Sequence, residues 1–280
     1  MSTTKKVRFD LRLVLSIAAI GAVCLIPLQA VAESFDELSP ERINPSRFDA
    51  FKDRLNKWNV VIGAGGIYAP KFEGSDEFEF QPFPMFSATF GEHVTVDPRG
   101  ISINVYNHQR FSFSAKVGYD PGRKEDDSDH LQGLGDIDAG AVVGGKLAYG
   151  LGPVELYTSF DKTIGGSDGL VGTVGANISH SYNQFLFSAG ASAIWADSNH
   201  MDSYFGVTAA QSARSGLAAY DAGAGFKRVD VEASVTYVTQ KNWLVQSQIG
   251  IGYLVGDAAD SPSVQDAFQP SVMLIFGYKL

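Results

Sequence analysis

The chain has 280 residues, of which 45% are hydrophobic and 19% charged, and its formal net charge is −9 at pH 7. A protein surface that binds nucleic acid needs an excess of positive charge, so this net negative charge argues against nucleic acid as a partner. Beyond residue 32 no apolar run reaches the length of about 20 residues that a transmembrane helix needs, which excludes a helical membrane protein.

Residues 1–32 have the organisation of a cleaved secretory signal peptide. Four basic residues precede an apolar run over 13–28, which ends in the small-residue pattern Ala30-Val31-Ala32. Lipidation at Cys24 is disfavoured, because Val23 is bulkier than the residue that usually precedes a lipidated cysteine. Cys24 is the single cysteine, so cleavage after Ala32 leaves a mature chain without a disulfide.

Residues 33–57 are polar and charged, with prolines at 40 and 45 and a weakly helical run over 48–57. We interpret this segment as a periplasmic N-terminal extension. A small plug and a disordered leader to the first strand remain the alternatives.

From Trp58 onward the pattern changes to strands with two different faces. Over 268–280, every second residue from Phe268 to Leu280 is apolar, apart from Pro270, while Gln269, Ser271 and Lys279 lie on the other face. The same two-residue period recurs in segments of about 9 to 14 residues, the pattern of an antiparallel outer-membrane β-barrel. The segments are 58–69, 78–90, 93–107, 110–119, 136–149, 153–164, 169–179, 184–196, 225–238, 242–255 and 268–280.

Eleven segments give an odd number, whereas a barrel whose two ends lie on the periplasmic side needs an even one. The turn sequence Asp97-Pro98-Arg99-Gly100 divides 93–107 into two short strands, which predicts twelve; ten is the alternative if early segments merge. Short turns at Tyr182-Asn183 and 240–242 are expected on the periplasmic side. The long polar loops 120–136, 197–224 and 256–267 are expected outside.

Aromatic residues recur ten positions apart within single segments. Ten steps along a strand tilted by about 45° rise roughly 24 Å, close to the lipid-facing band of about 25 Å between aromatic girdles. We therefore predict two interfacial belts, formed by Trp58 and Tyr68, Phe80 and Phe90, Phe185 and Trp195, Trp243 and Tyr253, and Phe268 and Tyr278. The opposite faces are polar and rich in small residues, which permits a narrow pore without establishing one.

No catalytic, cofactor-binding or metal site is predicted. The sequence NVVIGAGGI over 59–67 begins like a dinucleotide fingerprint, but Tyr68 takes the place of its third glycine and Pro70 begins a turn, so these glycines fit a crowded strand better. The five histidines show no nucleophile or metal spacing; His180-Ser181 and Asp197 with His200 are the pairs that a barrel-rim hydrolase would use. The acidic run 125–130 lacks the spacing of a calcium loop, and cation bridging to lipopolysaccharide is its weak alternative.

An ordered series of short sequence motifs resembles the MipA/OmpV family, and the resemblance runs from about Trp58 to Leu280. The motifs are Tyr68-Ala69-Pro70 with 73–76, Gly133-Leu134-Gly135-Asp136, Tyr204-Phe205-Gly206-Val207 through 212–217, and 257–262. One departure is Leu280, which replaces the terminal aromatic residue typical of outer-membrane strands.

The resemblance implies an integral protein of the Gram-negative outer membrane, in contact with its lipid and lipopolysaccharide. It also implies a non-enzymatic scaffold for peptidoglycan remodelling, because the family's namesake joins a lytic transglycosylase to a bifunctional murein synthase. The alternatives are a narrow diffusion pore and a surface adhesin that uses 197–224. No partner-binding residue is predicted, although 33–57 is the candidate contact.

Overall fold

The computed structural model describes residues 58–91 and 93–280, so the predicted signal peptide and the extension over 33–57 lie outside the described residues. Twelve strands account for most of the described chain. Their bounds are β1 Trp58–Pro70, β2 Phe78–Phe90, β3 Val94–Asp97, β4 Gly100–His108, β5 Phe111–Asp120, β6 Gly140–Leu151, β7 Val154–Ile164, β8 Leu170–Tyr182, β9 Phe185–Ala196, β10 Gly225–Val238, β11 Trp243–Leu254 and β12 Phe268–Lys279.

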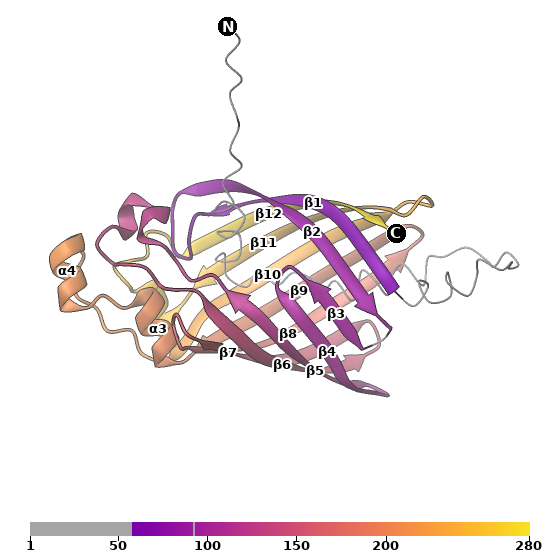
Figure 1. Cartoon of the computed structure of the whole chain (residues 1–280), viewed down its shortest axis with the longest axis horizontal. Coiled ribbons are helices and arrows are strands. Elements are labelled where there is room, and N and C mark those ends of the chain that lie inside the picture. The colour runs from indigo at the N-terminus through magenta and orange to yellow at the C-terminus, as the bar shows by residue number, and fades with distance from the viewer. Residues whose placement is uncertain (1–57, 92) are drawn as a thin grey trace, which may run out of the picture.

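The strands form a closed antiparallel barrel in which each strand pairs with its neighbours in sequence and β1 pairs with β12 (Figure 1). The predicted division of 93–107 is confirmed: β3 and β4 pair across a two-residue turn, and the count is twelve. None of the helices in the described ranges is long and apolar enough to cross a membrane.

The two ends of the barrel differ in their connections, as predicted. At one end the connections are short, spanning 91–93, 109–110, 152–153, 183–184 and 239–242, and Asn183 and Asn242 adopt the left-handed conformation that such turns need. At the other end the connections are 71–77, 121–139, 165–169, 197–224 and 255–267. These carry the helices of the described ranges: η3 Glu125–Asp127, η4 Asp129–Leu131, α3 Ser198–Phe205, α4 Ala209–Ser215 and α5 Gly256–Ala259.

The aromatic belts are confirmed where side chains are described. Tyr68 lies opposite Phe80 in the β1–β2 register at the long-loop end, and both are more than half exposed on the outer face. At the short-turn end, Trp243 lies opposite Tyr278, and their ring centroids are 5.0 Å apart. Amphipathic rings at two levels fit the two membrane–water interfaces. Short turns are typical of the periplasmic end of an outer-membrane barrel, which remains our expectation for the short-turn end.

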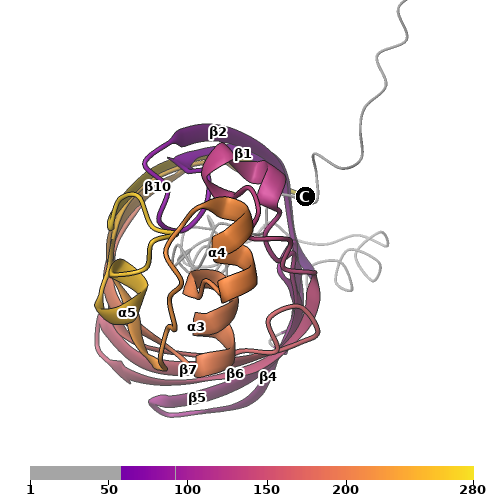
Figure 2. The same cartoon turned by 90° about the vertical axis from the view of Figure 1, so that its left-hand side faces the viewer.

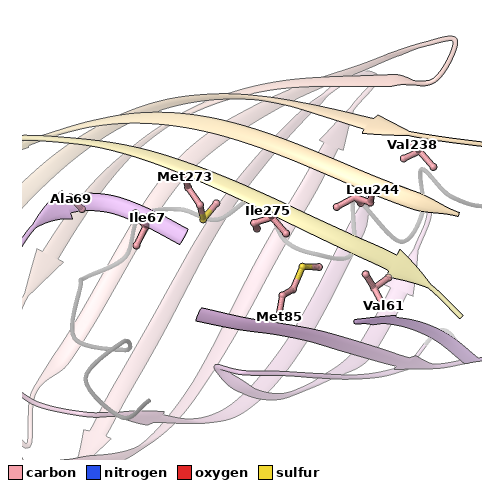
Figure 3. Packing of buried hydrophobic residues seen from close by; sticks show 8 residues of the cluster. All are labelled: Val61, Ile67, Ala69, Met85, Val238, Leu244, Met273 and Ile275. Atoms are coloured by element: carbon pink, nitrogen blue, oxygen red, sulfur yellow. The ribbon is translucent and has the colours of Figure 1, made fainter. Parts of the chain in front are cut away.

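The inner face near β1 carries an apolar cluster rather than an entirely polar surface. Figure 3 shows its eight members, which come from β1, β2 and β10 to β12: Val61, Ile67, Ala69, Met85, Val238, Leu244, Met273 and Ile275. The glycines of 59–67 lie in strand β1, as predicted. A Cβ at Gly63 would collide with the backbone of Phe276 and Gly277, so this glycine permits the close approach of β1 and β12 that closes the barrel.

Candidate functional site: the closed outer mouth and the lumen

The long loops fold over the outer mouth of the barrel, and we call residues 197–224 the lid. Seen from the long-loop end, α3 and α4 lie across the opening (Figure 2). Met201 and Phe205 of α3 are fully buried against Ala196, Ala222, Leu254 and Ala258. Val207 packs against Phe72, Leu131 and Leu134 from two other loops. The lid is therefore held by apolar contacts to three other loops.

Local sequence signals form the two helices of the lid. Asp197 caps α3, because its carboxylate accepts a hydrogen bond of 3.0 Å from the backbone N–H of His200. Thr208 and Gln211 form a reciprocal capping box at the start of α4, and Gly216 ends that helix with a positive φ of 79°. Asp197 and His200 thus serve helix capping and lid packing, because the carboxylate binds a backbone N–H rather than the imidazole.

A cluster of four charged side chains and one histidine lies where the lid meets the barrel. The Nζ atom of Lys227 is 2.7 Å from Oε2 of Glu73 and 3.1 Å from Nε2 of His200. The Nε atom of Arg228 donates a 2.7 Å hydrogen bond to Asp230 and its terminal nitrogen lies 3.7 Å from Glu73. We call these five residues, from the β1–β2 loop, α3 and β10, the mouth cluster. The side chains of Glu73, Lys227, Arg228 and Asp230 are each at most 10% exposed.

A β-bulge makes the mouth cluster possible. In a regular strand Lys227 and Arg228 would point to opposite faces, and one of them would enter lipid. The register of β10 against β9 shifts between Phe226 and Arg228, and both basic side chains are buried on the inner side. The consecutive basic pair in an otherwise alternating segment was the available signal for this bulge, and our sequence analysis missed it.

Burial and charge together fix the protonation of the loop residues in the mouth cluster. Burial opposes ionisation of Glu73, but the charges of Lys227 and Arg228 outweigh it and hold its pKa at about 2. Burial and the neighbouring Lys227 charge lower the pKa of His200 to about 3. The imidazole is therefore neutral at pH 7 and accepts from Lys227 at Nε2, which assigns its proton to Nδ1. That Nδ1 is buried without a hydrogen-bond partner.

A second set of polar contacts ties the lid to the β5–β6 loop. Arg123 donates a 2.8 Å hydrogen bond to the backbone oxygen of Tyr204, and the Tyr204 hydroxyl donates to Asp120. Burial and the nearby Asp120 charge raise the pKa of the Tyr204 phenol. Burial lowers the pKa of the Arg123 guanidinium. These bonds compensate the burial of polar groups at the loop interface and orient α3.

Carboxylates of the acidic run 125–130 accept hydrogen bonds from groups of their own loop. The Glu125 carboxylate accepts from the backbone N–H groups of Gly133 and Gly135, and Asp127 accepts from that of Lys124. Asp136 accepts from the Lys124 ammonium at 2.9 Å. No group of three or more metal-ligating side chains occurs within the described residues. The carboxylates therefore shape the loop.

The remaining histidines lie apart from one another. His93 is in the β2–β3 turn, His108 ends β4, and Nε2 of His130 lies 3.2 Å from the backbone oxygen of Pro262. His180 is exposed on β8, where it borders an open depression of about 460 Å³ with Ile178, Phe187 and Ile249. The structure thus brings none of these four histidines to the mouth cluster.

The lumen beneath the lid is unevenly filled. The inward side chains Thr236, Gln246 and Gln248 of β10 and β11 are at most 3% exposed, and Gln248 donates to Glu232 at 3.0 Å. On the opposite wall, formed by β5 to β7, most inward side chains are partly exposed, whereas Ala148 and Thr163 are buried. This wall carries two ion pairs, Lys116–Asp161 at 2.8 Å and Lys146–Glu155 at 2.7 Å.

A glycine makes room for one of these ion pairs. In the β5–β6–β7 register, Gly144 lies between Lys116 and Asp161. A Cβ at Gly144 would collide with the Asp161 carboxylate. The lysine therefore reaches across an intervening strand because that strand has no side chain at this level, a relationship that the sequence analysis did not identify.

Comparison with protein families gives one match. The family model described as MltA-interacting protein MipA matches residues 62–280 of the chain. Comparison with curated proteins gave no significant match.

Solved outer-membrane barrels share similarity with the chain. The NanC porin matches with a TM-score of 0.42 and 10% identity, over 78% of this chain and 100% of that one. OmpT of Vibrio cholerae, in its trimer form, matches with a TM-score of 0.36 and 6% identity over 80% and 99%. OpdK of Pseudomonas aeruginosa, solved with vanillate, matches with a TM-score of 0.34 and 11% identity over 71% and 52%. The chain thus spans about half the length of OpdK.

Proposed function

The chain belongs to the MipA family of outer-membrane β-barrels, and we propose that it is a non-enzymatic scaffold that tethers peptidoglycan-remodelling enzymes at the periplasmic face. The proposed clients are a lytic transglycosylase and a bifunctional murein synthase. The family name, which describes an interaction with MltA, supports the first of these clients.

The observation that carries this proposal is the closed outer mouth. Apolar contacts and the mouth cluster fasten the lid over the barrel, so the outer end resembles a packed protein interior. A pore protein depends on an open path, whereas a scaffold depends on a fixed body and a complementary surface. The closed mouth therefore favours a function at the surface of the barrel over passage through it.

We propose 33–57 as the contact segment. Strand β1 begins at the short-turn end, so Trp58, which directly follows this segment in the sequence, lies at the end of the barrel that we assign to the periplasm. Each periplasmic turn has only two to four residues. A specific interface buries roughly 800 Å² on each partner, which is more than one such turn supplies.

Crosslinking in intact cells, followed by mass spectrometry of the partners, tests the proposal. We expect specific recovery of a lytic transglycosylase or murein synthase, compared with an unrelated barrel of similar abundance. Recovery of only the assembly machinery and neighbouring porins would overturn the scaffold. A variant that lacks 33–57 separates the two parts of the proposal: unchanged client recovery would refute the contact segment and leave the scaffold standing.

A narrow diffusion pore is the second candidate, and the wall formed by β5 to β7 favours it. The Lys116–Asp161 and Lys146–Glu155 pairs line a part of the lumen that water reaches. Single-channel recording in a planar bilayer distinguishes this candidate. Conductance steps by the unaltered protein would support the pore, and their absence would count against it.

A further inference from the structure

A depression of about 460 Å³ lies in the wall formed by β8 to β11, four strands that lie side by side (Figure 1). It opens on the outer face of the barrel, because Ile178, Phe187 and Ile249 line it and are large apolar side chains exposed on that face. The inward residues of the lining, such as Ser188 and Ser234, are buried. The depression therefore faces the membrane rather than the lumen.

Small side chains form the floor of the depression. In the β9–β10 register Ala189 lies opposite Ala233, and both are exposed on the outer face. On β8, Ile178 lies opposite Ala189, and on β11, Ile249 lies opposite Ala233. Two isoleucines thus flank two alanines at one level, which leaves a furrow two strands wide between larger apolar side chains.

The backbone beneath this furrow is paired within the sheet. Strand β9 pairs with β8 and β10, and β10 pairs with β9 and β11, in registers that have no shift near Ala189 or Ala233. The N–H and C=O groups of this part of both strands therefore have partners on both edges. Hydrocarbon can fill the furrow without leaving a polar backbone group unsatisfied.

His180 places a polar ring at one border of the depression. It lies opposite Phe187, one outward pair away from Tyr182 and Phe185 at the short turn. Two residues along a strand tilted by about 45° rise about 5 Å, so the imidazole lies just inside the aromatic belt. The rings of such a belt lie at the level of the lipid headgroups. The imidazole therefore lies close to the ester groups that join headgroup and acyl chains.

This imidazole has no hydrogen-bond partner within the described part of the chain. A polar side chain that faces lipid without a partner is costly, and an imidazole carries an N–H donor in either protonation state. The membrane supplies acceptors at this depth, the ester and phosphate oxygens of its glycerophospholipids. Hydrocarbon alone would fill the furrow and leave the N–H of His180 unpaired, whereas a phospholipid supplies both a chain and an oxygen.

We propose that the depression on β8 to β11 is a phospholipid site, in which an acyl chain lies over Ala189 and Ala233 and His180 donates a hydrogen bond to an ester or phosphate oxygen of the same lipid. The chain meets apolar side chains on both sides of the furrow, and the oxygens lie at the depth of the belt. The lipid belongs to the leaflet at the short-turn end. This site is independent of the proposed scaffold.

Quenching of tryptophan fluorescence by a phospholipid brominated on its acyl chains tests the proposal in micelles of a sugar detergent. The detergent covers the barrel but has no ester or phosphate group, so a phospholipid site enriches the brominated lipid over the rest of the outer face. The native Trp58, Trp195 and Trp243 are first replaced by phenylalanine. Phe187→Trp then reports the depression, and Phe113→Trp is the control.

Phe113 matches Phe187 in its place on the barrel. Each is the second outward aromatic residue after a short turn, following Phe111 on β5 and Phe185 on β9. The exposed fractions of Phe113 and Phe187 are 40% and 43%. Phe113 lies outside the depression, so the two positions differ in the site and not in depth.

We expect half-maximal quenching of Phe187→Trp at a lipid fraction about three- to tenfold lower than that of Phe113→Trp, the effect of one hydrogen bond. His180→Ala should remove this difference, and His180→Gln, which keeps an N–H donor, should restore part of it. If Phe187→Trp does not assemble, Val235→Trp reports the same depression.

Equal lipid fractions at the two positions would overturn the proposal, because the depression would then bind phospholipid no better than the rest of the outer face. A difference that persists unchanged in His180→Ala would also overturn it, because the furrow alone would then hold the chain.

Discussion

Removal of the Glu73 charge should loosen the lid without unfolding the barrel. In the variant Glu73→Gln, Lys227 loses its buried counter-charge and keeps only neutral acceptors, the His200 imidazole and the introduced amide oxygen, while Arg228 retains Asp230 at 2.7 Å. Removing one partner of a buried ion pair costs about 3 to 5 kcal/mol. Because Arg228 remains paired, we expect the lower end, about 3 kcal/mol, which corresponds to roughly a hundredfold rise in the population of the open lid.

Limited trypsin digestion of intact cells measures this opening from outside. Arg214 lies on α4 in the lid, and cleavage after it requires that segment to leave its contacts with Gly133 and Leu134. When closing is faster than cleavage, the cleavage rate follows the open population, so Glu73→Gln should be cut about a hundredfold faster.

The matched control is Glu77→Gln in the same loop. Glu77 pairs with Lys71 at 2.6 Å, but both side chains are exposed to solvent. Solvent screens such a pair, so cleavage in the lid should stay close to that of the unaltered protein. Equal cleavage rates for Glu73→Gln and Glu77→Gln would refute our view that an uncompensated Lys227 charge next to His200 favours opening of the lid.

Three further predictions concern the lid, the lumen wall and the interior. Opening the lid returns the pKa of His200 from about 3 toward its ordinary 6.5. The stability of the closed lid is therefore complete above pH 6.5 and falls by about 1.4 kcal/mol per pH unit below it. Hydrogen exchange of α3, corrected for intrinsic rates, should show this slope, and His200→Gln should remove it. Gly144→Ala should lower the free energy of unfolding, measured in urea, by about 1 to 3 kcal/mol, because the added methyl group displaces the Lys116–Asp161 ion pair. A similar loss in the lipid-facing control Gly145→Ala would contradict this explanation. Leu244→Ala should lower the free energy of unfolding by about 2 to 5 kcal/mol in the same assay, because the Leu244 side chain is fully buried. The outward Leu274→Ala should lower it less. Equal losses would argue against a stabilising role of the apolar cluster.

Much of the barrel could be predicted from the sequence because strands in a membrane respond to two local solvents. Alternation with a period of two records lipid on one face and the lumen on the other, and it located β2 and β10 at their observed bounds. Turn chemistry at residues 97–100 also corrected the strand count, since proline and glycine restrict the backbone locally.

The mouth cluster could not be predicted in the same way, because it depends on contacts between distant residues. Glu73 and Lys227 are 154 positions apart, and only the folding of the loops over the barrel brings them to 2.7 Å. Strict alternation would point Lys227 outward, but the bulge in β10 turns it toward the lumen. The alternation that predicted this strand therefore gave the wrong face for a residue that contacts the lid.

The sequence by itself determined the class of fold, the position of the strands and the polarity of the two faces, because each depends on neighbours within one strand. Only the tertiary structure decided that the outer mouth is closed, that Gly144 makes room for an ion pair, and that β2 pairs with β3 only at Ala88, Thr89 and Phe90. These features depend on how far each strand extends beside its neighbour and on which loops meet, and neither is fixed by local alternation.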